Sequence, residues 1–276
     1  MSSIFSVVTP TSNSLRYLDE TIQSVVFQRG KFHIDYVVID NCSTDGTLEL
    51  LKKYQDDISN DIIQCNCDGV SFRFVSEKDE GMYEAVIKGM KMCNGDYFSY
   101  INSDDFYLPN AFATVDRVFN KHNVNWITGL PGLYDDFGAI RPSNTPCVYK
   151  SSYIRSGVYG KQVPHIQQES TFWKKEMCDL LDFEKLSEFK YAGDFYIWYV
   201  FAETNILRTV NAQFAGFRIH SGNKSNDLAA YNLEVNSLSL TRLGCFDYAK
   251  IRIYKRLFGL MGNNLLPYLP NVISLD

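Results

Sequence analysis

The sequence has no apolar run long enough to cross a membrane, because no segment contains the roughly 18 uninterrupted apolar residues that a spanning helix needs. It also has no excess of positive charge, since 27 lysine and arginine residues face 32 aspartate and glutamate residues, for a net charge of −5. This balance argues against a nucleic-acid partner, which usually contacts a basic face. No signal peptide is predicted either, because Ser2 and Ser3 lead straight into a short strand-like run.

The motifs of several enzyme classes are missing as well. There is no G-x-G-x-x-G after the first strand-like run and no G-x-x-x-x-G-K-S/T, so neither a dinucleotide fingerprint nor a P-loop is predicted. No G-x-S-x-G elbow occurs, and the four histidines lack zinc-site spacing. The seven cysteines contain one close pair, Cys65 and Cys67, whose spacing matches no common metal or redox motif. We therefore expect reduced thiols and a cytoplasmic protein.

The first hundred residues alternate apolar, β-rich runs with helical patterns. The runs predict strands at residues 4–9, 34–40, 72–75 and 96–101, and the apolar spacing predicts helices at about 15–25, 46–54 and 81–92. Strand–helix alternation implies right-handed crossovers and a mainly parallel sheet. The expected fold class is therefore α/β, with a Rossmann-like sheet flanked by helices.

After residue 125 the pattern changes. Strand-like stretches near 124–129, 146–150 and 165–172 are joined by turns, a helix is predicted at about 192–203, and the chain reads as helical and basic from Asp227 onward. With no linker and no internal repeat, we expect one domain over residues 1–226, with halves of about 1–105 and 106–226, and a helical extension over 227–276. Residues 242–260 form a basic amphipathic pattern, which fits contact with an anionic membrane, packing on the domain or a homodimer.

Polar residues gather where the four predicted strands end, which is where ligands bind to an open parallel sheet. The most specific feature is the pair Asp104 and Asp105, which follows the fourth strand. Adjacent carboxylates repel each other, and a hard cation such as Mg²⁺ or Mn²⁺ is typically bound by one or two carboxylates together with ligand phosphates and water. A surface turn with a helix cap is the structural alternative for this pair alone.

The motifs taken together resemble glycosyltransferase family 2, whose members are inverting, nucleotide-sugar-dependent enzymes of the GT-A fold. The resemblance covers roughly residues 4–225 and rests on motifs that occur in order. These are FSVVTPTSN at 5–13, VVIDNCSTDGT at 37–47, SEKDEGMYEA at 76–85, NSDD at 102–105, QQESTFW at 167–173, YAGDFYIW at 191–198 and GFRIHSGNKS at 216–225.

The resemblance implies a donor site in the first half of the chain. The residues that it assigns to the nucleotide are Thr9, Pro10, Asn13, Asp40, Asp79, Gly81, Ser103 and Asp104. Asp40 would contact the base, and Asp104 the ribose or the metal. Asp105 would bind the metal and the diphosphate, and His220 can approach either of them.

The resemblance assigns the acceptor side to the second half. Gln168, Glu169 and Ser170 lie in its acceptor segment, and Asp194 is its general base. An inverting transfer needs a carboxylate that takes the proton of the acceptor hydroxyl. Asp194 begins a predicted helix, whose N-terminus would favour the ionised form. Without the resemblance, Asp194 also fits an ordinary helix cap.

The implied activity is transfer of a hexose or N-acetylhexosamine to a saccharide or lipid-linked saccharide, in cell-envelope polysaccharide or glycan biosynthesis. UDP is the favoured carrier, with dTDP and GDP as alternatives, and Mn²⁺ or Mg²⁺ is the expected metal. The rival functions are a sugar nucleotidyltransferase, which should carry a Gly-rich basic loop after the first strand, and a non-catalytic carbohydrate-binding protein of the same fold. Placement on the inner face of the membrane is a further expectation.

Overall fold

A mixed eight-stranded sheet forms the centre of the molecule in the computed structural model, with the strand order β12-β10-β6-β9-β4-β1-β2-β3. The structure describes residues 2–142, 148–161, 163, 165–223, 227–261 and 271–275, and of residues 254–261 it describes the backbone alone. All neighbouring strands in this sheet run parallel except β9, which is antiparallel to both β4 and β6. The expected α/β class with a mainly parallel sheet is therefore confirmed.

The strands of the large sheet are β1 (Ser3–Thr11), β2 (Phe32–Asp40), β3 (Gly69–Ser76), β4 (Tyr97–Tyr100), β6 (Trp126–Leu130), β9 (Thr171–Lys174), β10 (Arg208–Gln213) and β12 (Val272–Ile273). A smaller sheet has the order β5-β11-β7-β8, built from β5 (Phe106–Tyr107), β7 (Leu133–Asp135), β8 (Ile140–Arg141) and β11 (Ala215–Ile219).

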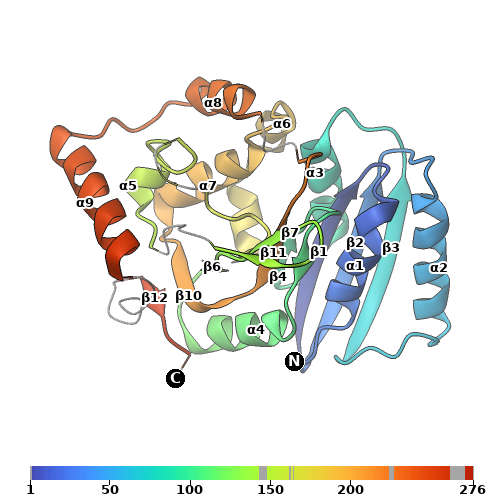
Figure 1. Cartoon of the computed structure of the whole chain (residues 1–276). Helices are drawn as coiled ribbons and strands as arrows, with labels where there is room; N and C mark the ends of the chain where they lie inside the picture. The colour runs from blue at the N-terminus through green and yellow to red at the C-terminus, as the bar shows by residue number, and fades with distance from the viewer. Residues whose placement is uncertain are drawn as a thin grey trace.

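The helices are α1 (Leu15–Val26), α2 (Thr47–Ser59), α3 (Met82–Met92), α4 (Ala111–Lys121), α5 (Ser151–Ile154), α6 (Phe183–Ser187), α7 (Gly193–Thr204), α8 (Leu228–Ser237) and α9 (Cys245–Met261), with a 3₁₀ helix at Lys175–Leu180. Figure 1 shows α2 and α9 on opposite sides of the molecule.

Helices cover both faces of the large sheet, which gives three layers. Along β2, Tyr36 and Val38 point into one buried apolar cluster, whereas Val37 and Ile39 point into another. This follows from the alternation of side chains along a strand. The first cluster is completed by α1, α2 and α4, and the second by α3, α7 and α8. Burial on both faces explains why the strands read as nearly continuous apolar runs.

Several predictions for the second half of the chain were wrong or incomplete. The stretch at 165–172 is a strand only from Thr171, because the residues before it form an irregular segment. Residues 148–150 are not a strand, and 143–147 lie outside the described part of the chain. The smaller sheet was not predicted, since its strands are two to five residues long. Short strands give little periodic signal.

The C-terminal stretch is helical in α8 and α9, as expected, but it ends in a strand. β12 pairs in parallel with β10 at the edge of the large sheet. Val235 and Ile251 belong to one apolar cluster and Ile273 to the other, so this stretch contributes to both cores. The division of the chain at residue 226 stays a prediction.

The described helices include none that is long and apolar enough to span a bilayer. The six described cysteines are free thiols. On α9, Phe246 is 85 % exposed and Ile253 is 59 % exposed, beside the exposed cations Lys250 and Arg252. This arrangement is compatible with the expected contact surface, which stays a prediction.

The aromatic cluster around Phe112 allows a test of the core. Its fully buried ring stacks on the Phe5 ring, with the ring centres 4.7 Å apart. It also makes edge contacts with Tyr107 and Phe172, at distances of 4.9 and 5.6 Å between ring centres. We expect Phe112→Ala to lower the free energy of unfolding by about 3–5 kcal/mol, because it leaves a cavity among rigid rings. The measurement is urea denaturation followed by circular dichroism.

The matched control is Phe137→Ala, because the Phe137 side chain is 93 % exposed. This variant should change the free energy of unfolding by no more than about 0.5 kcal/mol. Equal effects of the two substitutions would contradict the arrangement of the core.

Candidate active site

A cavity of about 1020 Å³ opens at the carboxyl ends of β1 and β4, and residues from Pro10 to Tyr231 line it. Parallel strands bring their carboxyl ends to one edge, where ligands usually bind. The residues predicted from the sequence that line it are Pro10, Asn13, Asp79, Ser103, Asp104, Gln168, Glu169, Asp194 and His220. Residues assigned to the donor, the metal, the acceptor and the general base therefore share one cavity.

Five other predicted residues do not line the cavity. Thr9 is fully buried, and its hydroxyl lies 3.0 Å from that of Tyr36. Gly81 precedes α3, while Ser170 and Asp105 are buried. The fifth, Asp40, is fully buried at the end of β2.

Asp40 organises the loops that follow β2 and β3. Its carboxylate accepts hydrogen bonds from the Ser43 amide at 3.1 Å, the Ser43 hydroxyl at 2.5 Å and the Ser76 hydroxyl at 2.6 Å. Asn13 joins this arrangement because its amide oxygen accepts the Thr44 N–H at 2.9 Å. Because Asp40 is fully buried, its role in this structure is to hold these two loops together.

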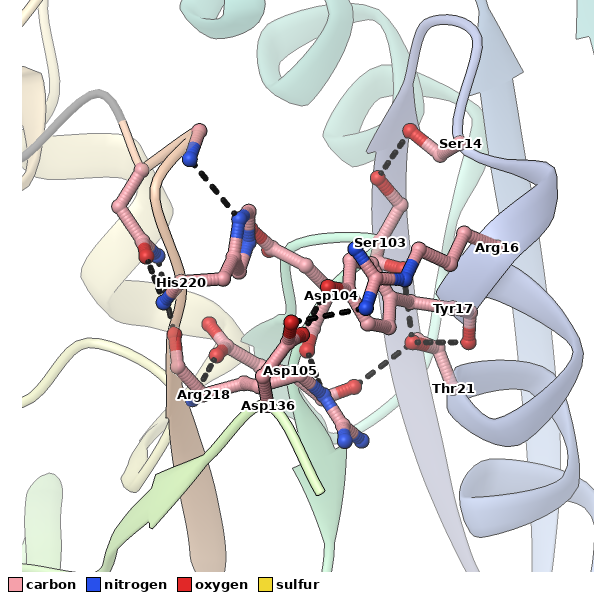
Figure 2. A network of polar contacts seen from close by, with 12 residues as sticks. Ser14, Arg16, Tyr17, Thr21, Ser103, Asp104, Asp105, Asp136, Arg218 and His220 are labelled. Carbon is pink, nitrogen blue, oxygen red and sulfur yellow. Dashed lines mark hydrogen bonds and ion pairs between the residues drawn. The ribbon is translucent and has the colours of Figure 1, made fainter. Parts of the chain in front are cut away.

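The two adjacent aspartates occupy different environments, as Figure 2 shows. Asp104 faces the cavity, and its Oδ2 lies 2.8 Å from Nε2 of His220. Asp105 points inward and is 1 % exposed. Its Oδ1 accepts the Arg218 N–H at 2.9 Å, while its Oδ2 is buried without a partner. Burial, followed by repulsion from Asp104 and Glu169, holds the pKa of Asp105 well above its usual value.

Arg218 on β11 fixes the backbone of the aspartate pair, and sequence reasoning missed it. Its Nε donates to the Asp104 carbonyl at 2.9 Å, and its Nη2 meets the Glu20 carboxylate of α1 at 2.5 Å. The guanidinium, which is almost fully buried, lies 5.1 Å from the ring centres of Tyr17 and Phe106. Arg218 lies within the motif at 216–225, in which the resemblance assigns a role to His220.

Tyr17 of α1 was missed as well. Its ring lies 5.0 Å from the His220 ring, and its hydroxyl donates to Asp136 in the β7–β8 turn. Arg16 pairs with the same carboxylate at 2.7 Å. These contacts join the β7–β8 turn to α1 beside the Asp104–His220 pair (Figure 2).

Asp194 lies at the second position of α7 and is partly exposed to the cavity. Its Oδ1 accepts the Phe195 N–H at 2.7 Å, and its own N–H donates to the Tyr83 hydroxyl at 3.1 Å. The helix start therefore does favour the ionised form, but burial outweighs it and raises the pKa of Asp194 to about 7.

The raised pKa of Asp194 has a consequence for stability. The folded state binds this proton more tightly than the unfolded chain, whose aspartates have ordinary pKa values. The stabilising contribution is complete at low pH and is lost as the pH rises through about 7. At neutral pH the ionised carboxylate thus costs folding free energy, as is common for functional groups.

Glu169 also lines the cavity but is almost fully buried, and its Oε1 has no partner. Burial, followed by the charges of Asp194 and Asp104, raises its pKa to about 8. The neighbouring Gln168 donates from its amide to the Tyr100 carbonyl, which ties this segment to the end of β4. Asp194 and Glu169 thus share a cavity in which burial and nearby negative charges oppose their ionisation.

The donor set fits a divalent cation in part. Within the described residues, no three His, Cys, Asp or Glu side chains are gathered into a metal site of their own. However, Asp105 leaves a buried carboxylate oxygen without a partner, and the adjacent residue Asp104 pairs with His220 at the cavity. Such an oxygen is costly to bury unless something satisfies it. A partial ligand set is what Mg²⁺ requires when ligand phosphates and water supply the remaining oxygens.

Comparisons with known proteins agree on one family. The family model for glycosyl transferase family 2 matches residues 6–181. Poly(ribitol-phosphate) beta-N-acetylglucosaminyltransferase TarS of Staphylococcus aureus is 29 % identical over 118 residues, which are 41 % of this chain and 19 % of TarS. The putative teichuronic acid biosynthesis glycosyltransferase TuaG of Bacillus subtilis is 29 % identical over 102 residues, which are 37 % of this chain and 36 % of TuaG.

The fold is shared with solved structures of TarS. The crystal structure of S. aureus TarS 1–349 in complex with UDP-GlcNAc matches with a TM-score of 0.60 and 16 % identity, over 97 % of this chain and 76 % of that one. This likeness concerns the fold, whereas the family model covers more than half of the 276 residues. The chain belongs to glycosyl transferase family 2.

Proposed function

We propose that the protein is an inverting glycosyltransferase that moves a sugar from a UDP-sugar to a hydroxyl of a saccharide or lipid-linked saccharide. The observation that carries the proposal is that Asp194 and the Asp104–His220 pair line the same cavity. Asp194 can thus take a proton from an acceptor, while the Asp104–His220 pair, together with a metal ion, would bind the leaving diphosphate. Family membership supports the reaction class, and the UDP-GlcNAc and UDP complexes of TarS support UDP as the carrier.

The proposed reaction is a single displacement. Asp194 takes the proton of the acceptor hydroxyl as its oxygen forms a bond to the anomeric carbon of the donor. The bond between that carbon and the diphosphate oxygen breaks on the opposite face, and its electron pair leaves with UDP. Asp194 suits this role better than Glu169, because Asp194 is partly exposed to the cavity whereas Glu169 is only 2 % exposed.

The leaving group needs compensation for its growing negative charge. Asp104, Asp105 and His220 would hold Mn²⁺ or Mg²⁺, which when bound offsets the charge of the diphosphate. Asp105 would contribute the oxygen that now lacks a partner. Asn13, Asp79 and Ser103 lie on the cavity wall for the nucleotide. Thr9 and Asp40 would shape that wall from below, since both are buried.

Cell-envelope polysaccharide assembly is the proposed setting, because the names of TarS and TuaG place these relatives in polymer glycosylation. An N-acetylhexosamine or a hexose is the proposed sugar. Through the exposed Phe246 and Ile253 and their flanking cations, α9 would contact an anionic membrane surface or a second copy of the chain.

Release of UDP tests the donor and the metal together. We expect the protein to release UDP from a UDP-sugar in a panel of UDP-, dTDP- and GDP-sugars, and to lose this activity in excess chelator. Mn²⁺ or Mg²⁺ should restore it, because the charge of the diphosphate would otherwise be uncompensated. Asp105→Asn should lose most nucleotide-dependent metal binding in calorimetry.

Two outcomes of this assay would contradict the proposal. Full activity in excess chelator would show that the reaction does not need a metal ion. Formation of pyrophosphate from a nucleoside triphosphate and a sugar 1-phosphate would favour a nucleotidyltransferase instead.

Replacement of Asp194 tests the general base. Asp194→Asn should lower kcat by about 10²–10⁴-fold, the usual contribution of a general base. The wild-type rate should rise with pH through about 7, as Asp194 loses its proton, and the variant should lack this rise. The dissociation constant for UDP should stay within a few-fold, because the donor residues are unchanged.

Thermal melting is the control that shows whether the variant is folded. Asp194→Asn removes a carboxylate that costs stability at neutral pH, so its Tm should equal or exceed that of the wild type. Near-normal turnover in a folded variant would move the base elsewhere, with Glu169 as the next candidate.

A further inference from the structure

Helix α8 lies beyond residues 6–181, which the family model matches, yet it contributes to the cavity. Leu228 and Tyr231 line the cavity wall, and Tyr231 packs against the His165 ring with the ring centres 4.7 Å apart. Tyr231 and Val235 are buried in the same core as α7. Positions three and four residues apart share a helix face, so Glu234 lies on the side of α8 that faces the protein.

The Glu234 carboxylate binds the three consecutive backbone amides of residues 190–192, directly before α7 begins at Gly193. Its Oε1 accepts the Lys190 N–H at 2.9 Å, and its Oε2 accepts the Tyr191 and Ala192 N–H groups at 2.9 and 2.7 Å. The N–H of the N-cap residue lacks a partner within the helix, and a carboxylate is favoured there. Ala192, which is the N-cap residue of α7, has no side chain that can cap it. From a distant part of the chain, Glu234 therefore supplies a partner for the Ala192 N–H and fixes the two residues before it.

Tyr83 on α3 holds the same segment from the other side. Its hydroxyl donates to the Tyr191 carbonyl at 3.3 Å and accepts the Asp194 N–H at 3.1 Å. A Cβ atom at Gly193 would lie 2.6 Å from the Tyr83 ring, so only glycine allows this approach. Glu234 and Tyr83 together fix the backbone of residues 190–194, which places the Asp194 carboxyl in the cavity.

We propose that Glu234 is a positioning residue for Asp194, so that α8 completes the active site from beyond residues 6–181, which the family model matches. This inference rests on the proposed role of Asp194 as the general base. A displacement of a catalytic group by about 1 Å lowers the rate on the order of 10²-fold. Glu234 does not line the cavity, so its effect should fall on turnover and leave donor binding unchanged.

The test substitutes Glu234→Gln, which keeps the size of the side chain but leaves one oxygen to serve three amides. We measure hydrolysis of UDP-GlcNAc, in which water takes the place of the acceptor, and the dissociation constant of UDP by calorimetry. We expect kcat to fall about 10- to 100-fold while the affinity for UDP changes less than about 2-fold. The matched control is Asp182→Asn, because Asp182 caps α6 through the Lys185 N–H at 3.1 Å and does not line the cavity. This control should retain wild-type turnover.

A double-mutant cycle separates this inference from the proposed function. If Glu234 acts through Asp194, then adding Glu234→Gln to the Asp194→Asn variant should not lower turnover any further. Normal turnover of Asp194→Asn would overturn the proposed base itself. If Asp194→Asn is impaired but Glu234→Gln behaves like Asp182→Asn, or if the two losses multiply, the positioning role of Glu234 is wrong. Should Glu234→Gln fail to fold in thermal melting, Glu234→Asp replaces it with the same outcomes, because it keeps both oxygens on a shorter side chain.

Discussion

The arrangement of the candidate active site depends on one buried cation. Arg218 is 4 % exposed and joins α1, the Asp104–Asp105 segment and β11, three elements that are distant in the sequence. Its guanidinium lies 5.1 Å from the centres of two aromatic rings, both of which attract a planar cation. By binding the Asp104 carbonyl, Arg218 sets where the two carboxylates point. Asp104 is thereby turned toward the cavity and Asp105 toward the interior.

Burial of carboxyl groups is the second constraint, and it connects stability to function. Desolvation raises the pKa values of Asp194, to about 7, and of Glu169, to about 8, and it also raises the pKa of Asp105. Groups that resist ionisation destabilise the folded protein at neutral pH, but they also supply a base that titrates near the working pH and oxygens that a cation can satisfy. The folded protein can tolerate this loss of stability because other contacts hold the segment in place. Glu234 and Tyr83 do so by hydrogen bonding to the backbone of Ala192 and Asp194.

Much of the fold could be predicted because strands buried on both faces appear in the sequence as apolar runs. The helices between them can be recognised from the spacing of their apolar residues. The cavity residues could be predicted because short polar motifs follow those strands. The burial of Asp40 and Asp105 could not, since it depends on which loop packs over each one. Arg218 and Glu234 were missed for a similar reason: their partners lie more than 40 residues away, as the 44-residue separation of Glu234 from Lys190 illustrates. β12 is too short to leave a periodic pattern.

The anomeric configuration of the product tests the central claim most directly. In the proposed mechanism the acceptor oxygen attacks opposite the leaving UDP, and Asp194 only removes a proton, so no sugar–enzyme bond forms. An α-linked donor such as UDP-GlcNAc should therefore give a β-linked product, read from the coupling of its anomeric proton in a nuclear magnetic resonance spectrum. A product that retains the α configuration would contradict direct displacement and the role assigned to Asp194.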